Sequence, residues 1–591
     1  MAKAKTAKKE KNLGFALFAS LVTLAILPNA MDAFLIPKAI ILVLGATWYF
    51  LSDFKIPRKL TKDPLELILI SFSIWLFILL IKSDYKWVTL FGVQGRSLGV
   101  LFYLSLIVLM WQARKFPFNK QVYVFNTFLV IGAIALIYGS MQKLQLDPFN
   151  WNLVYEGIIG VFGNPNFAGA FAALLGIGGF SLFVEKTRNL KWRIFGAIIV
   201  LLSIFNIYAS NARQGYVSLA IGIAPILVYL LFNLNKPAGL AAVGISIIGL
   251  FLFILGLFQT GPLANIVYKQ SVSYRGDFWR TAQNMIAENS IFGVGFERFG
   301  VNYRSYRDLN QVLRNGIDAY SDNAHNIYLQ FAATGGLLLS ILYLLLNILV
   351  VRIFIQRFRL ESEKRFFYLT ISSIWIAIQA QSLISVDTPS IALWGWLFAG
   401  IICARPSEVI SKRNEFTINK VVAIIVLMSM SVLFIFQLNT QSGMRTAFYT
   451  QIPKNNEEYA VAKEKLLKQE ENREPLNAEW PILSANSLYQ DEAFKQSAAA
   501  AKRAIHLDPK DYRAWYFLAS SQEKLGSFTE AIKSREAAAV IDPYNAENLL
   551  ELGRDYVKIN EPAKAQELIN KIKEFAPKSS QYSDALKELT R

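Results

Sequence analysis

The chain has 591 residues, of which 54% are hydrophobic and 18% are charged, whereas about a quarter of the residues in a typical soluble protein are charged. This composition argues against a single soluble globule. The net charge of +18 is unevenly spread, because residues 1–450 hold 40 basic and 20 acidic side chains and residues 451–591 hold 21 and 23. The basic excess therefore belongs to the apolar part. There it predicts loops that fix orientation in a bilayer, not a nucleic-acid surface, and we expect no nucleic-acid partner.

Ligands for a metal ion are scarce in this sequence. It contains one cysteine, Cys403, and two histidines, His325 and His506. An internal disulfide is excluded, and a cysteine-cluster or zinc site is disfavoured, so we expect no metal and no cofactor. Five lysines precede the first apolar stretch, which begins near Leu13 and lacks an evident cleavage site. We interpret this stretch as an uncleaved membrane helix.

Apolar runs predict an all-α, polytopic membrane bundle of about thirteen helices. Each run can cross about 30 Å of hydrocarbon at a rise of about 1.5 Å per residue. The runs occupy residues 13–30, 34–51, 65–82, 97–113, 122–141, 167–184, 194–210, 215–232, 237–258, 325–350, 366–386, 390–404 and 421–438. If the lysine-rich start is cytoplasmic, the basic loops all fall on that side, as the positive-inside rule requires. An odd number of spans then places everything after residue 439 outside the cytoplasmic (inner) membrane.

The exterior tail repeats every 34 residues. The positions that recur are Pro475, Pro509, Pro543 and Pro577, and Ala485, Ala519 and Gly553. This is the tetratricopeptide period, with small residues where helices pack closely and prolines between repeats. It predicts an α-solenoid of three repeats over 476–577, followed by a short capping helix.

The chain accordingly divides into three parts. Residues 1–440 form a membrane domain with a long exterior loop at 259–324, residues 441–475 form a linker, and residues 476–591 form the repeat domain. A solenoid of this size serves as a partner-binding device or as a spacer. Because its repeats show no convergent polar cluster, we expect the tail to bind a partner protein and not to catalyse a reaction.

A polar segment, Ser321 to Gln330, stands at the outer mouth of the tenth run and contains the histidine of the membrane domain, His325. A helix amino terminus disfavours the imidazolium form. The segment therefore predicts a neutral imidazole that can accept a proton near neutral pH. In the alternative, Asp322 or Asn323 merely caps the helix and His325 is an interfacial side chain. Helix physics alone leaves both interpretations open.

Five segments, in order along the chain, resemble motifs of the O-antigen ligase and polymerase superfamily. They are Phe162-Gly163-Asn164-Pro165-Asn166; Asn211-Ala212-Arg213-Gln214-Gly215, where alanine replaces the usual serine; Tyr274-Arg275-Gly276-Asp277-Phe278-Trp279; Gly293-Val294-Gly295 with Phe299; and His325-Asn326 followed by Tyr328-Leu329-Gln330 and Gly335-Gly336. The resemblance covers about residues 90–405. It implies a polytopic enzyme that uses polyprenyl-pyrophosphate glycans at the outer membrane face, of the ligase subgroup with a tetratricopeptide tail.

The resemblance also implies a division of roles. In the ligases two arginines, matched here by Arg213 and Arg275, hold the pyrophosphate of the lipid donor, and the residue matched by His325 assists the acceptor hydroxyl without a metal. Bidentate guanidinium groups suit the negative charge that grows on the leaving pyrophosphate, and a single displacement would invert the anomeric centre. Arg96 and Arg280 are secondary candidates for substrate binding, and for both a salt bridge is the favoured interpretation.

Three further residues are candidates for supporting the site. Asp322 orients the imidazole or, as the favoured interpretation, caps the helix, and Asn326 belongs to the same motif. Asp387 is either a cap near the site or a buried partner of an arginine. Residues 277–289 are expected to form an amphipathic helix whose apolar face packs on the bundle, on the loop or on the bilayer surface.

The leading interpretation is a glycosyltransferase of the ligase type that moves a lipid-linked glycan onto a glycan, lipid or protein acceptor. A polysaccharide polymerase and a protein O-oligosaccharyltransferase would share these motifs. A transporter is disfavoured, because the charged candidates gather at one membrane face and no inverted repeat is evident. A non-catalytic anchor for the solenoid is disfavoured by the presence of both arginines and the histidine.

Overall fold

The computed structural model describes residues 14–28, 30–53, 55–57, 62–149, 151, 156–267, 270–405, 415–417, 425–435, 437, 438, 461 and 477–576. The lysine-rich start, nearly all of the expected linker and the expected capping helix after residue 577 lie outside these residues. The described chain is helical except for two three-residue strands, β1 (Lys55–Pro57) and β2 (Glu415–Thr417), which pair antiparallel.

The membrane domain is a bundle of long apolar helices, so the chain is a multi-pass membrane protein. Seven helices in the described part are long and apolar enough to span a bilayer: α3 (Pro64–Lys82), α6 (Phe118–Lys143), α7 (Pro165–Val184), α8 (Leu190–Ala209), α9 (Arg213–Leu234), α10 (Lys236–Leu257) and α16 (Leu337–Leu360). Shorter apolar helices are Gly14–Leu24, α2 (Ile36–Asp53), α5 (Val100–Ala113), α18 (Pro389–Ile402) and Ile425–Ile435. Each expected run contains a helix, but the count of thirteen spans is not confirmed.

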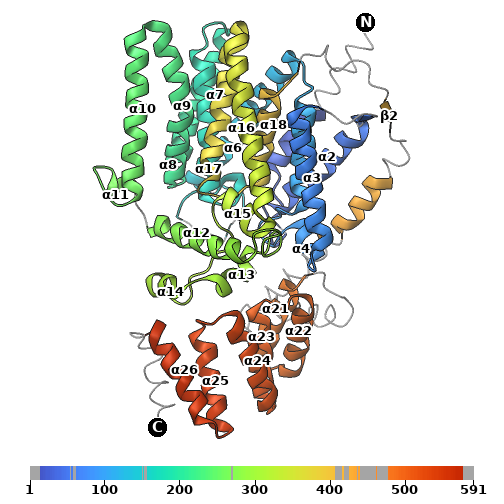
Figure 1. Cartoon of the computed structure of the whole chain (residues 1–591). Helices are drawn as coiled ribbons and strands as arrows, with labels where there is room; N and C mark the ends of the chain where they lie inside the picture. Colours follow the sequence, from blue (N-terminus) through green and yellow to red (C-terminus); the bar gives the residue numbers. More distant parts are fainter. Residues whose placement is uncertain are drawn as a thin grey trace.

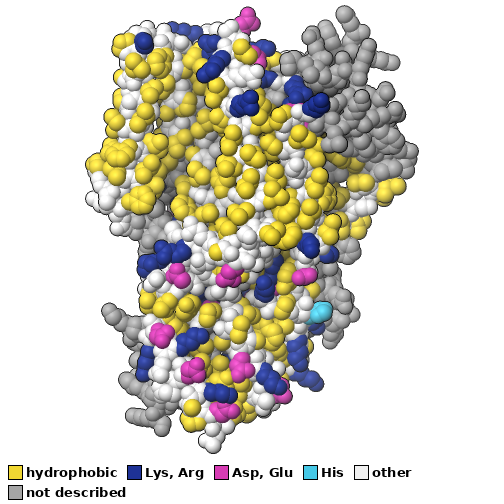
Figure 2. Space-filling view, in the orientation of Figure 1, with side chains coloured by type: hydrophobic (Ala, Val, Ile, Leu, Met, Phe, Trp, Pro, Cys, Tyr) yellow, Lys and Arg dark blue, Asp and Glu magenta, His cyan; other side chains and the backbone are white. Residues whose placement is uncertain are grey.

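Apolar side chains cover the outside of the bundle as well as its core. Figure 2 shows a broad hydrophobic surface over the helix bundle, in the upper half of this view, with lysines and arginines at both of its edges. Inside, small residues let helices approach closely, as is common in membranes. A Cβ on Gly179 of α7 would lie 2.8 Å from the carbonyl oxygen of Gly196 of α8. The two backbones therefore touch at this point.

The expected span at 325–350 is wrong as a single helix. It is divided into the short α15 (Ile327–Gly335) and the spanning α16, with Gly336 between them at φ +84°. A Cβ at Gly336 would collide with the carbonyl oxygen of Ile291. Only glycine combines this left-handed conformation with so close an approach. His325 therefore precedes a short helix that packs into the core of the bundle through Ile327 and Phe331, and it does not directly precede a spanning helix.

The long loop expected to be exterior, residues 259–324, consists largely of helices. They are α11 (Ala264–Val267), α12 (Gln270–Glu288), α13 (Phe299–Tyr306) and α14 (Leu309–Asn315). The remaining elements of the membrane domain are α4 (Lys86–Phe91), α17 (Arg365–Ser382), and the 3-10 turns η1 (Gly160–Phe162) and η2 (Ser362–Lys364). In Figure 1, α12 lies across one end of the bundle, and α13 and α14 lie between it and the tail.

The tail forms the expected antiparallel helix pairs. They are α21 (Glu479–Gln490) with α22 (Phe494–Leu507), α23 (Tyr512–Lys524) with α24 (Phe528–Ile541), and α25 (Ala546–Lys558) with α26 (Pro562–Phe575). The repeated small residues are buried where the helices meet, with Ala485 and Ala519 fully enclosed. Pro509 and Pro543 fall in the turns between pairs. The tetratricopeptide prediction is confirmed for the described repeats.

Candidate active site

The segment around His325 is held in a turn of unusual conformation. His325 has φ +50°, and its backbone N–H donates to Oδ1 of Asn323 over 2.8 Å. Non-glycine residues in this region are uncommon and concentrate at functional sites. The imidazole stacks on Phe278 of α12, with ring centroids 5.7 Å apart. The histidine is therefore fixed between the start of α15 and the exterior loop.

Asn326, and not Asp322, caps α15. The side-chain Oδ1 of Asn326 accepts from the backbone N–H groups of Tyr328 and Leu329 over 3.0 and 3.1 Å, and Nδ2 donates to the backbone carbonyl of Leu383 over 3.2 Å. This is the bonding expected of an N-cap asparagine. The interpretation of Asp322 as the cap is wrong, and the carboxylate of Asp322 is available for other contacts.

Asp322 forms a two-point ion pair with Arg96. The arginine Nε and Nη2 donate to Oδ2 and Oδ1 over 2.7 and 2.9 Å. Burial alone would raise the pKa of Asp322, but the Arg96 guanidinium outweighs burial and lowers this pKa below its ordinary value. Arg96 lies in the turn between α4 and α5, where Gly95 and Ser97 have φ +77° and +57°. The turn delivers the arginine to a partner 226 residues away.

Arg275 lies on α12 and acts on the same histidine. Burial lowers the pKa of Arg275. Burial also lowers the pKa of His325 to about 4, and the positive charges of Arg275 and Arg96 push it the same way against the opposing effect of Asp322. His325 is therefore neutral at physiological pH. It can accept a proton there, which is the state that a general base requires.

The apolar face of α12 packs inside the protein. Its residues join α13 and α15 in one cluster, formed by Ala282, Met285, Phe299, Tyr303, Ala324 and Ala333. The motif residue Asp277 is buried and accepts from Arg314 and Asn315 at the end of α14, the latter over 2.7 Å. Of the three expectations for this helix, packing on the bundle and on the loop is therefore observed, and Asp277 has a structural role.

Arg213 and Arg280 are exposed, whereas Arg96 and Arg275 are half-buried. Arg213 is the first residue of α9 and is exposed, after Asn211 at φ +53°. The charges that act most strongly on His325 belong to Arg275, Arg96 and Asp322, not to Arg213. Arg280 is 53% exposed, and its nearest carboxylate oxygen, on Asp308, is 3.9 Å away. The position of Arg280 is as consistent with a weak surface salt bridge as with substrate binding.

Comparison with known proteins now bears on this arrangement. Residues 198–344 match the family described as O-antigen ligase, and residues 482–546 match the tetratricopeptide repeat. Residues 198–344 are therefore similar to an O-antigen ligase domain. The matched residues include Arg213, Arg275 and His325, whereas the motif beginning at Phe162 lies outside the match. The resemblance inferred from the motifs is thus confirmed, together with that of the tail.

Other comparisons add no argument. No curated protein matches the chain. Among solved structures, the crystal structure of an APC/C hetero-tetramer, Cut9–Hcn1, is aligned over 88% of this chain and 96% of that chain. Its identity is 12% and its TM-score is 0.22, so it does not bear on the fold.

Two buried carboxyl groups lie beside the candidate site, Glu297 and Asp387. Glu297 has φ +62° in the segment that leads into α13, and the charges of Arg96, Asp322 and Asp387 act on its pKa. Asp387 accepts from the hydroxyl of Tyr103 over 3.4 Å. Asp387 was expected to be a helix cap or the buried partner of an arginine. These contacts show neither role. Glu297 carried no sequence signal, because only its tertiary neighbours distinguish it from other acidic loop residues.

A buried lysine was also not predicted from the sequence as a functional candidate. Lys38 lies in the first turn of α2, is almost fully buried, and donates to the carbonyl of Val161 beside the motif that begins at Phe162. Asp32, which precedes α2, lies near both Lys38 and Arg96. A signal was available for Lys38, since an ionisable residue within an apolar run is a candidate for function.

Burial of Glu297 predicts that the protein becomes less stable as the pH rises through the neutral range. Burial raises the pKa of Glu297 from 4.5 to about 8, so the folded protein keeps a proton that the unfolded chain releases above pH 4.5. Stability should therefore fall as the pH rises from about 5 to about 8. Glu297→Gln should reduce this fall, and the exposed Glu530→Gln should not. Thermal unfolding in detergent across this range measures the effect, and equal slopes in the three proteins would contradict it.

Proposed function

We propose that the chain transfers a glycan from a polyprenyl-pyrophosphate donor to an acceptor at the outer face of the cytoplasmic membrane. The proposal rests on one observation above all: a neutral, half-buried histidine in a left-handed turn lies beside Arg275 and the Arg96–Asp322 pair, and both Arg275 and His325 fall within the residues similar to the O-antigen ligase family. A base next to fixed cations suits a reaction in which an acceptor loses a proton while an anionic leaving group forms.

In the proposed reaction the chain's own residues divide the work. Arg213 and Arg275 bind the donor pyrophosphate and stabilise the charge that grows as the glycosidic bond breaks. His325 takes the proton from the acceptor hydroxyl as its oxygen attacks the anomeric carbon. Arg96 holds Asp322, whose carboxylate favours the imidazolium that results. One displacement inverts the anomeric centre, and no metal takes part.

The proposal also includes the orientation of the chain in the membrane. The amino terminus is cytoplasmic, and the site and the repeat tail face outward. The charge distribution supports this orientation, since the short loops opposite the tail hold most of the basic residues.

A membrane-impermeant thiol probe should label a cysteine at Thr529 in intact cells once the buried Cys403 has been replaced.

Within the class, ligase, polymerase and protein O-oligosaccharyltransferase differ only in the acceptor. The test uses the purified full-length chain with a labelled polyprenyl-pyrophosphate glycan, alone and with lipid, glycan or protein acceptors. Glycan on an acceptor supports the ligase or protein-transferase reaction, and a longer glycan on the lipid supports a polymerase. Retained configuration in the product or loss of transfer in a chelator would contradict the proposed mechanism. Donor movement across vesicle membranes without transfer would favour the transporter.

A further inference from the structure

The repeat tail binds the exterior loop of its own chain through a row of buried ion pairs. Arg298, at the start of α13, donates to both carboxylate oxygens of Asp508 over 2.7 and 2.8 Å. Arg304 and Arg307 donate to the two oxygens of Asp542 over 2.7 and 2.8 Å. Asp508 and Asp542 occupy equivalent positions in successive repeats, directly before Pro509 and Pro543. The expectation that the repeats lack a convergent polar cluster is therefore wrong.

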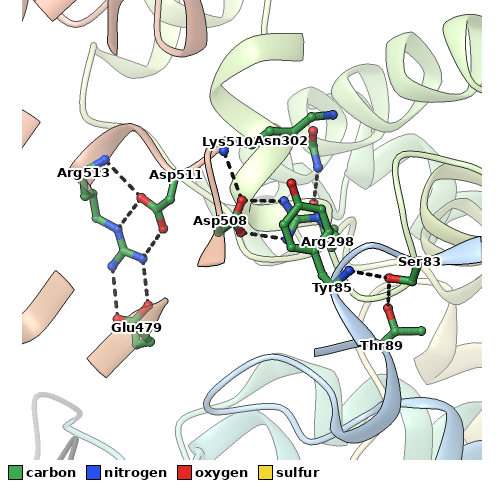
Figure 3. Close-up of polar contacts among 10 residues, drawn as sticks. All are labelled: Ser83, Tyr85, Thr89, Arg298, Asn302, Glu479, Asp508, Lys510, Asp511 and Arg513. Carbon is green, nitrogen blue, oxygen red and sulfur yellow. Dashed lines mark hydrogen bonds and ion pairs between the residues drawn. The ribbon is translucent and has the colours of Figure 1, made fainter. Parts of the chain in front are cut away.

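Arg298 connects three parts of the molecule. Its side chain is 3% exposed, and its guanidinium lies 3.3 Å from the ring centroid of Tyr85, between α3 and α4. Figure 3 shows this arginine between Tyr85 on one side and Asp508 of the tail on the other, close to Asn302 of α13. One side chain thus joins the bundle, the exterior loop and the solenoid.

Apolar contacts complete the interface. Val312 of α14 is buried in a cluster with tail residues, among them Leu549 and Phe575. The hydroxyl of Ser305 also donates to the carbonyl of Ile541 over 2.7 Å. The surface of the repeats that carries Asp508 and Asp542 is therefore occupied by residues 298–312 of the same chain.

The docked segment is continuous with the candidate active site. Glu297, next to Arg298, is the buried carboxyl group beside Arg96 and Asp322. A Cβ on Gly300 of α13 would lie 3.0 Å from the Cα of Asp322, so α13 is in direct contact with the backbone that leads to His325. Since proteins are packed at high density, a shift of α13 must move this backbone.

We propose that docking of the tail onto α13 positions the transfer site, with Arg298 as the positioning residue through which the tail acts. This inference rests on the proposed function. The ion pairs are suited to the task because the guanidinium groups are buried by the tail. Removing the carboxylates would leave these buried positive charges without a counter-charge in the interface, which favours the undocked state in which water solvates them.

The test replaces both acidic partners in the full-length chain, as Asp508→Asn with Asp542→Asn. The matched control is Asp555→Asn, because Asp555 is as fully buried as Asp542 but pairs with Arg535 inside the tail, over 2.8 Å. We expect about a tenfold or larger fall in single-turnover transfer in the double variant, in the range of typical coupling between sites. Hydrogen exchange over residues 293–325 should become faster. Asp508→Glu with Asp542→Glu, which keeps both charges, should restore part of the rate.

Three results would overturn the proposal. They are an unchanged transfer rate in the double variant, an equal fall in the Asp555 control while its tail stays folded, and no faster exchange over residues 293–325. If the unaltered chain transfers no glycan at all, the proposed function fails separately. The exchange experiment then still decides whether the tail holds the segment that carries Glu297 and His325.

Discussion

Replacing His325 with glutamine is expected to slow single-turnover transfer by on the order of 10²- to 10⁴-fold, the usual contribution of a general base. Glutamine approximates the size of the imidazole but cannot take up a proton at neutral pH. Donor affinity should be unchanged, because in the proposal the pyrophosphate contacts Arg213 and Arg275. The measurement is transfer and donor binding in one detergent. His506→Gln, in the exposed second histidine of the chain, is the matched control.

The pH dependence of transfer by the unaltered enzyme also tests the role of His325 as the general base. Because burial and two neighbouring arginines lower the pKa of His325 to about 4, the base stays deprotonated through the neutral range. The rate should be nearly constant from pH 6 to 8 and should fall only as the pH approaches about 4. A base with the ordinary pKa of about 6.5 would already be half protonated at about pH 6.5, so the rate would fall within the range from pH 6 to 8. Near-normal transfer by the His325→Gln variant would contradict the proposed mechanism.

Replacing Arg275 or Arg213 with lysine is expected to weaken donor binding by about ten- to a hundredfold, although the charge is kept. A planar guanidinium makes two parallel bonds to a phosphate, and an ammonium group cannot reproduce that contact. A lost hydrogen bond to a charged group corresponds to this range. Single-turnover transfer should fall as well, because the same contacts stabilise the leaving group.

Arg280→Lys provides the comparison on the same helix as Arg275. Arg280 is exposed and lies 3.9 Å from its nearest carboxylate, so its replacement should change neither binding nor transfer. Donor affinity that is unaltered in both the Arg275 and Arg213 variants would refute the clamp. An effect at Arg280 alone would transfer the binding role to that residue.

The sequence by itself determined the features that depend on local pattern. Apolar runs located the membrane helices, because a span must satisfy its backbone within one segment and present apolar side chains to lipid. The 34-residue period located the repeats, since each repeat packs only on its neighbours. The motifs around Arg213, Arg275 and His325 led to the O-antigen ligase domain. None of these features requires knowledge of a distant contact.

The tertiary structure alone decided what surrounds those residues. Asp322 was expected to cap a helix, but it pairs with Arg96, 226 residues away, and Asn326 is the cap. The division of the tenth run at Gly336 depends on contact with Ile291, in another segment. Arg298 meets Asp508 only because the tail folds back onto the loop. Local patterns report the conformation of one segment, whereas burial, ion pairing and pKa values arise where segments far apart in the sequence come together.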